Sequence, residues 1–194
     1  MLRSKVDITG NKILDDLILS IVSFATLILL GHIQLDLAEG LPITLQSLIV
    51  VLFPLMFGPR VGVTFVVAYL IAGGFGAPVF ANNESGWGHF VGSTGGFLLA
   101  FPIAALFSGV CGEVASKIPA LNRITFITGA MILFLSQIII LLLGIGWLDA
   151  ISNSSFDFAA KITALIPRLL VKTALGTIVF VLTGRILNNL NSQR

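Results

Sequence analysis

Four ionisable residues lie close together near the C-terminal end of an otherwise hydrophobic sequence: Asp157, Lys161, Arg168 and Lys172. Their spacings of four, seven and four residues place them roughly along one face of a helix that begins near Asp157. At 1.5 Å per residue, Lys172 lies about 17 Å further along that helix than Lys161, which is near the middle of a bilayer. The pattern therefore predicts a polar stripe that runs inward from one membrane surface.

The charges on this stripe do not balance, because three cations face a single carboxylate. An Arg or Lys at the centre of a membrane helix costs roughly 2.5–3.5 kcal/mol, so it must be paired or hydrated. A carboxylate ligand would complete the balance through charge-assisted hydrogen bonds. The alternative is that Lys161 reaches the membrane surface while Arg168 and Lys172 bind backbone carbonyls or water.

The stretch 75–97 is long, rich in glycine and nearly uncharged. Glycine lets a backbone approach a ligand closely, and the other residues offer aromatic rings and hydrogen-bonding groups. We expect this stretch to close as an outer lid, with Gly95 and Gly96 permitting the movement. The alternative is a mobile connector. The side chains expected to contact a ligand are Phe80, Asn82, Trp87, Ser93 and Thr94.

The run Pro42-Ile43-Thr44-Leu45-Gln46 opens an apolar segment. Pro42 suits the first turn of a helix, which places Thr44 and Gln46 at or just below the outer membrane interface. Because an amide in lipid is costly, we expect Gln46 to face the interior of the protein. Its role is then either a hydrogen bond between helices or a contact with a ligand.

The composition is that of an integral membrane protein. Of the 194 residues, 56% are hydrophobic and 10% are charged, and the mean hydropathy is +1.04. We predict an all-α fold with six transmembrane helices in one bundle, a single domain over residues 1–194. A hydrocarbon core of about 30 Å needs ~20 helical residues, so the second and third helices are short and the sixth is long. The six predicted segments are 13–31, 41–57, 61–74, 95–112, 124–146 and 161–187.

Basic residues occur in alternate connections between these segments. Eight of the 11 lysines and arginines precede the first segment, follow the second or the fourth, or lie at the end of the sixth or beyond it. By the positive-inside rule this side is cytoplasmic, and both termini lie there. The connections 32–40, 75–94 and 147–160 contain acidic residues but no Lys or Arg, so they share the outer face. The same distribution argues against a nucleic-acid partner, although the net charge is +2.

Several kinds of chemistry have no support in the sequence. A Gly-Lys-Ser/Thr phosphate loop does not occur, so the chain does not hydrolyse ATP by that route. The two histidines, His32 and His89, lack Cys or carboxylate companions at metal-ligand spacing. No nucleophile and base suggest themselves as a pair. We therefore expect neither an enzyme nor a bound metal or cofactor.

Ordered motifs occur over residues 41–101: Pro-Ile-Thr-Leu-Gln at 42–46, Phe-Gly-Pro-Arg at 57–60, Tyr69, Gly-Ala-Pro-Val-Phe-Ala at 76–81 and Gly-Ser-Thr-Gly-Gly-Phe-Leu-Leu at 92–99. This region closely resembles the BioY family, the biotin-specific substrate-binding (S) components of energy-coupling-factor (ECF) transporters. Family members carry an acidic residue three positions before a lysine in the sixth helix. Here Lys172 is kept, but Leu169 stands in the acidic position. Asp157 would then take over part of that role.

The resemblance implies a multi-pass protein of the bacterial cell membrane, surrounded by membrane lipid. It would bind biotin outside and pass it inward when joined to a transmembrane coupling subunit and two ATPase subunits. The carboxylate of biotin suits the cationic stripe, the ureido ring suits amides and Asp157, and the thiophane ring suits Trp87 and the phenylalanines. The predicted substrate-binding residues are Thr44, Gln46, Phe80, Asn82, Trp87, Ser93, Thr94, Asp157, Lys161, Arg168 and Lys172.

Two other functions stay open from the sequence. One is a stand-alone secondary carrier coupled to an ion, although an inverted repeat is not obvious and intramembrane carboxylates are few. The other is an S component for a different anionic vitamin.

Overall fold

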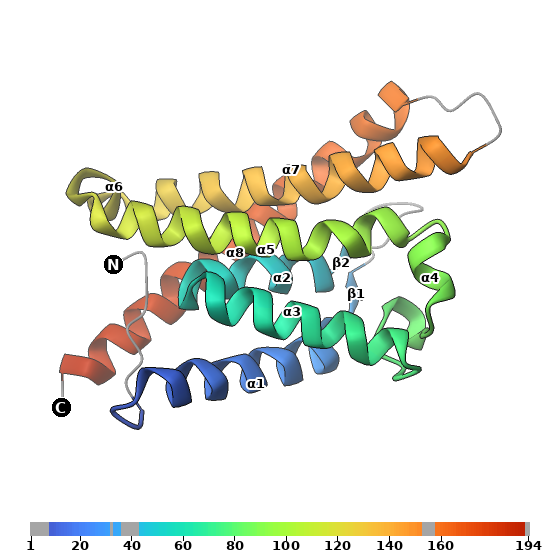
Figure 1. The fold of residues 1–194 in the computed structure, drawn as a ribbon. Helices are drawn as coiled ribbons and strands as arrows, with labels where there is room; N and C mark the ends of the chain where they lie inside the picture. The colour runs from blue at the N-terminus through green and yellow to red at the C-terminus, as the bar shows by residue number, and fades with distance from the viewer. Residues whose placement is uncertain (1–7, 32, 36–42, 153–157, 193–194) are drawn as a thin grey trace.

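A computed structural model of the chain describes residues 8–31, 33–35, 43–152 and 158–192. The fold is α-helical apart from one short pair of antiparallel strands (Figure 1). Its long helices are α1 (Lys12–Gly31), α2 (Gln46–Phe57), α3 (Pro59–Gly74), α5 (Gly95–Lys117), α7 (Thr125–Ile151) and α8 (Phe158–Ser192). The short elements are strands β1 (Gln34–Leu35) and β2 (Ile43–Thr44), the 3-10 helix η1 (Ala81–Asn83), and helices α4 (Gly88–Val91) and α6 (Pro119–Arg123).

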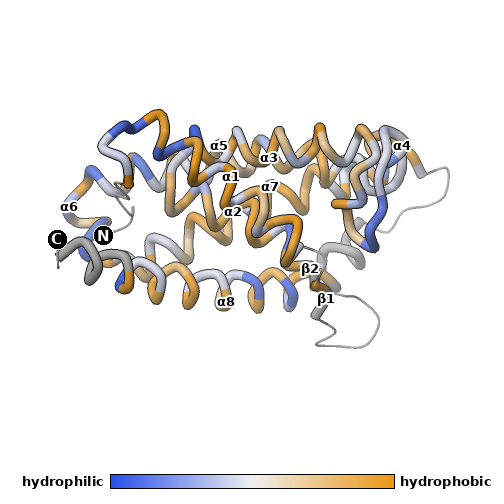
Figure 2. The backbone as a smooth tube through the Cα atoms, turned by 90° about the horizontal axis from the view of Figure 1, so that it is seen from below, coloured by the Kyte–Doolittle hydropathy of each residue, from blue (hydrophilic) through white to orange (hydrophobic). Residues whose placement is uncertain are grey.

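Within the described part of the chain, four helices are long and apolar enough to cross a membrane: α1, α5, α7 and the Leu165–Ile186 part of α8. Helices α2 and α3 are also apolar but have only 12 and 16 residues. Figure 2 shows that hydrophobic residues predominate along the helices, with hydrophilic positions on α8 near the strand pair. The prediction that the second and third apolar segments are short is confirmed. So is the length of the last helix, which has 35 residues.

The second helix begins later than the sequence predicts. Strand β2 pairs with β1, with Thr44 opposite Gln34, and α2 starts only at Gln46. The expectation that Thr44 lies inside this helix is therefore wrong, while Pro42 lies outside the described residues. Strand pairing is the reason, because it uses backbone groups of β2 that another helical turn would need.

Successive long helices run in alternating directions (Figure 1). The start of α1, the α2–α3 turn, α6 and the end of α8 lie towards one end of the bundle, which we name the α6 end. The strand pair and α4 lie towards the opposite end, which we name the α4 end. Five basic residues of the described helices lie at the α6 end, as the sequence pattern predicts: Lys12, Arg60, Lys117, Arg123 and Arg185.

Helices α2, α3 and α5 form the tightly packed centre of the bundle. Gly58 turns the chain between α2 and α3 with a φ of 101°, a conformation that favours glycine. Gly109 of α5 lies so close to this turn that a Cβ would be 2.6 Å from the backbone N and Cα of Pro59. Nearby, Ser108 Oγ donates a hydrogen bond of 2.6 Å to Val51 O. Because lipid tails are as apolar as leucine, close contacts through small residues are what hold such helices together.

Replacing Gly109 with Ala should destabilise the protein by about 1–3 kcal/mol, the usual cost of overpacking. The added methyl group would meet backbone atoms, which cannot rotate away as a side chain can. Gly146→Ala in α7 is the matched control, because a Cβ at that position meets nothing within 4 Å. Thermal unfolding of both variants in the same detergent measures the difference. Equal melting temperatures for the two variants would contradict the close contact.

Candidate functional site

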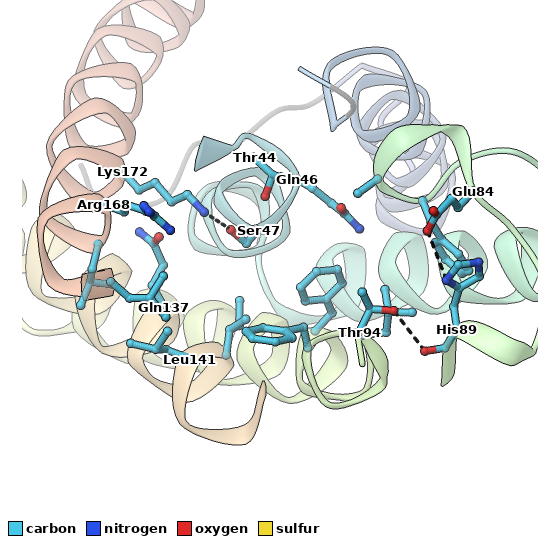
Figure 3. Close-up of a pocket in the computed structure, with 18 residues that line it drawn as sticks. Thr44, Gln46, Ser47, Glu84, His89, Thr94, Gln137, Leu141, Arg168 and Lys172 are labelled. Carbon is cyan, nitrogen blue, oxygen red and sulfur yellow. Dashed lines mark hydrogen bonds and ion pairs between the residues drawn. The ribbon is translucent and has the colours of Figure 1, made fainter. Parts of the chain in front are cut away.

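A cavity of about 290 Å³ lies towards the α4 end, between α2, α5, α7, α8 and the 80–94 segment (Figure 3). Most of its walls are apolar side chains, including Phe80, Phe97, Leu98, Phe101, Ile140, Leu141, Leu165 and Leu169. The polar residues that line it are Thr44, Gln46, Ser47, Glu84, His89, Thr94, Gln137, Arg168 and Lys172. A mostly apolar cavity with a few polar groups is the usual form of a small-molecule site.

Arg168 and Lys172, one turn apart on α8, form the cationic end of this cavity (Figure 3). Lys172 Nζ donates a hydrogen bond of 2.9 Å to Ser47 Oγ on α2. Gln137 of α7 reaches the same end, with its Nε2 3.4 Å from Thr173 Oγ1. Both cations are half-buried, and neither forms an ion pair within the described part of the chain. This end of the cavity is therefore suited to an anion.

Glu84 and His89 line the opposite end (Figure 3). Oε2 of Glu84 lies 3.4 Å from Nδ1 of His89, a pair that is ionic when His89 is protonated. The His89 ring packs edge-on against Phe80, with 5.7 Å between ring centroids. Half of the Glu84 side chain is exposed, so this end reaches the protein surface. The cavity is thus positive at α8 and carries a hydrogen-bond acceptor at the far end.

Gln46 is held in place by a buried chain of hydrogen bonds. Its Nε2 donates to Tyr69 Oη at 2.7 Å, and Tyr69 Oη donates in turn to Val79 O at 2.7 Å. The expectation that Gln46 faces the interior is confirmed, since it is buried. It bonds a neighbouring helix and also lines the cavity, so the geometry agrees with both roles weighed from the sequence.

The glycines at the start of α5 make a close contact with α7. A Cβ on Gly96 would lie 2.8 Å from Leu143 O and would overlap the Trp147 side chain. Trp147 Nε1 also donates a hydrogen bond of 2.9 Å to Gly92 O. Gly95 and Gly96 are both buried where these two helices meet. That they permit closure of the preceding segment on ligand binding stays a prediction. Because these two glycines have no side chain, the start of α5 can pack closely against α7.

Six of the predicted site residues lie around the cavity: Thr44, Gln46, Phe80, Thr94, Arg168 and Lys172. Thr94 comes from the last loop before α5, and its Oγ1 donates to His89 O at 3.2 Å. Asp157 lies outside the described residues, as does the side chain of Lys161. Whether the six contact a ligand stays a prediction.

Three other predicted residues, Asn82, Trp87 and Ser93, are exposed and do not line the cavity. The backbone turns at positive φ at Asn82, which directs this part of the segment along the surface. Trp87 instead packs on Phe90, with 5.2 Å between ring centroids. The expectation that these three side chains point into the same cavity as Phe80 is therefore not met.

Sequence reasoning missed Ser47, Glu84, His89 and Gln137 as cavity residues. A usable signal existed for Gln137, because an amide within the apolar segment 124–146 carries the same cost that singled out Gln46. Glu84 counted only as one of several acids on the outer face. Leu169 is also informative: it is buried at 8% exposure and lines the cavity. The position where the resemblance leads one to expect an acid thus faces the cavity, but it supplies no carboxylate.

The arrangement fits an elongated amphipathic ligand with an anionic group at one end. Arg168 and Lys172 supply donors for the anion, the phenylalanines and leucines pack against an apolar middle, and polar groups meet the other end. Among the described residues, no three His, Cys, Asp or Glu side chains are grouped so that they could hold a metal ion.

The relatives found by comparison with known proteins agree with one another. The model of the BioY family matches residues 3–190. The chain is 31% identical over 147 residues to the "Probable biotin transporter BioY" of Pyrococcus horikoshii, covering 75% of this chain and 83% of that protein. It is 37% identical over 91 residues to the "Biotin transporter BioY" of Thermotoga maritima, covering 46% of this chain and 53% of that protein.

A solved structure has the same fold over almost the full length. It is the crystal structure of "the S-component for biotin from an ECF-type ABC transporter", with a TM-score of 0.68, 97% of this chain and 96% of that chain covered, and 24% identity. At this identity the structural match shows the fold alone. The family match over residues 3–190 shows more than the fold, and this chain therefore belongs to the BioY family.

Proposed function

We propose that this protein binds biotin on the outer face of a bacterial cell membrane and serves as the S component of an ECF-type ABC transporter. Membership of the BioY family supports this, as do relatives whose names describe biotin transporters. The observation that carries the proposal is the cavity with two cations at one end and polar acceptors at the other. Biotin has a carboxylate and a ureido ring at opposite ends of an apolar body.

In this proposal the biotin carboxylate accepts hydrogen bonds from Arg168 and Lys172. Such charge-assisted bonds are the strong ones, and the anion relieves the cost of two cations inside an apolar bundle. The ureido N–H groups then point towards the acceptors at the other end, where Glu84 and Gln46 line the cavity. The thiophane ring and the aliphatic chain pack against the apolar walls.

The same proposal sets the orientation in the membrane. The chain forms a single domain in which all six long helices cross the bilayer, and the basic α6 end with both termini faces the cytoplasm. The cavity at the α4 end then opens outside. Helix α2 spans about 18 Å at 1.5 Å per residue, less than a hydrocarbon core of about 30 Å. Tilting or local thinning of the bilayer accommodates such a mismatch at a modest cost.

Energy for transport comes from other chains in this proposal. The sequence has no phosphate loop, so a transmembrane coupling subunit and two ATPase subunits supply ATP hydrolysis. A bundle with short central helices is suited to tilt against such a partner, which would present the cavity to the inner side.

Replacing Lys172 with Met should weaken biotin binding roughly 10- to 100-fold, the value of one hydrogen bond to a charged group. The fold should be as stable as before or more stable, because the substitution removes a costly charge. Lys117→Met is the matched control, since Lys117 is exposed at the α6 end and pairs with Glu113 on its own helix at 3.1 Å. Calorimetric titration and thermal unfolding of both variants test the prediction. Equal biotin affinity in the wild type and Lys172→Met would refute it.

A panel of ligands should separate biotin from other anionic vitamins. Biotin should raise the melting temperature of the purified protein, and biotin methyl ester should raise it much less, because the ester carries no negative charge to pair with Arg168 and Lys172. Nicotinate and pantothenate are the comparison ligands. A larger shift with one of them would favour an S component for a different vitamin.

Transport itself should require the partner subunits. Protein reconstituted alone in liposomes should bind biotin but accumulate none against a gradient, and the coupling subunit, the ATPases and ATP together should restore accumulation. Uptake of radiolabelled biotin measures both cases. Accumulation by this chain alone, driven by a proton or sodium gradient, would instead establish that the protein is a secondary carrier.

A further inference from the structure

A second cavity lies at the α6 end, far from the site above in the fold. Its volume is about 450 Å³, and it is formed where the α6–α7 connection meets the C-terminal part of α8. Phe126, Ile127, Phe180 and Val181 supply apolar walls. Arg123 and Arg185 line the same cavity from two different helices.

The two arginines have no recorded partner within the described residues. Both are exposed, and neither takes part in an ion pair there. Lys117, which lies at the same end, is by contrast paired with Glu113. Two guanidinium groups at one cavity repel each other, so a shared anion would stabilise the arrangement. The planar donor fork of arginine suits the oxygens of a phosphate group.

The apolar surroundings identify the kind of molecule that carries the phosphate. Ile124, Phe126 and Ile127 on one side, and Leu182 and Ile186 on the other, are exposed large hydrophobic residues. On a membrane-spanning protein such side chains face lipid. The cavity therefore combines cations at the level of lipid headgroups with an apolar surface that continues along α7 and α8. A free phosphate ion would use only the first of these features.

Gly184 lines this cavity on α8, and a Cβ at this position would meet nothing within 4 Å. The first atom of a larger side chain would therefore clash with no neighbouring atom. Gly184 therefore offers a way to fill the cavity while both arginines stay in place.

We propose that this cavity binds the phosphate group of an anionic phospholipid. Arg123 and Arg185 hold the phosphate, and an acyl chain lies against Phe126, Ile127 and Phe180. Basic pockets between membrane helices at the cytoplasmic side are suited to such headgroups, because that leaflet is rich in anionic lipid. This site is separate from biotin binding and does not depend on it.

The test uses the full chain in detergent, titrated with phosphatidylglycerol or with zwitterionic phosphatidylcholine. Retained lipid is counted by native mass spectrometry, and the melting temperature is followed in parallel. Phosphatidylglycerol should be retained preferentially, and Arg123→Gln/Arg185→Gln should weaken its binding about 30-fold, since each cation contributes about a factor of five. The control Lys12→Gln/Arg60→Gln removes two exposed cations near the same end that do not line the cavity, and it should bind like the wild type.

Gly184→Leu gives an independent test that leaves every charge unchanged. It should melt like the wild type in phosphatidylcholine and should lose most of the preference for phosphatidylglycerol, because its side chain occupies the cavity. Equal weakening by the two double variants would overturn the proposal, since it would indicate diffuse attraction to basic residues. Stabilisation by inorganic phosphate equal to that by phosphatidylglycerol would overturn the lipid assignment. Unchanged lipid preference in Gly184→Leu would show that the cavity is not the binding site.

Discussion

Two cations on one turn of α8, placed inside an apolar bundle without a carboxylate paired to them among the described residues, impose the main constraint on this protein. A charge in such surroundings is tolerated when it is hydrated or hydrogen-bonded. Ser47 meets part of this need for Lys172. Leu169 lines the same cavity, but its side chain offers no hydrogen-bond acceptor to either cation. This end of the cavity is therefore suited to an anion, and the remaining walls limit the size and shape of an anion that would fit.

The rest of the structure positions the cavity walls around these two cations. Helices α2, α3 and α5 are held together by close glycine and serine contacts, so the cavity walls that α2 and α5 contribute have fixed positions. Helices α7 and α8 contribute Gln137, Arg168 and Lys172 from the other side. The walls that come from long helices lose little entropy on binding, because few of their side chains must be ordered at that moment. The long apolar helices thus explain both membrane insertion and a preformed cavity.

Much of the fold could be predicted from sequence, because hydrophobic segments and the alternation of basic residues are local signals. The short α2 and α3 and the long α8 followed from segment lengths alone. The start of α2 did not, since it depends on the pairing of β2 with residues eight and ten positions earlier. Long-range contacts of this kind leave no local trace in composition.

The site was predictable to a similar degree and for the same reason. Gln46, Arg168 and Lys172 stood out because each is costly in lipid, and all three line the cavity. Asn82, Trp87 and Ser93 were chosen by residue type, but side-chain direction in the 75–94 segment is set by positive-φ turns and by aromatic packing. Gln137 could have been found in the same way as Gln46, because it is also an amide within an apolar segment. The free-energy cost of placing a polar or charged side chain in lipid thus identified cavity residues better than residue type did in the 75–94 segment.

The hydrogen-bond chain from Gln46 through Tyr69 to Val79 has a thermodynamic consequence for the α4 end of the bundle. Val79 belongs to the segment that covers the cavity, so the amide available to a ligand also anchors its cover. A ligand that bonds to Gln46 changes the free energy of that anchor, and by reciprocity any change in the anchor alters ligand affinity by the same factor. Residues of the outer segment that never touch the ligand can therefore tune how tightly it is held.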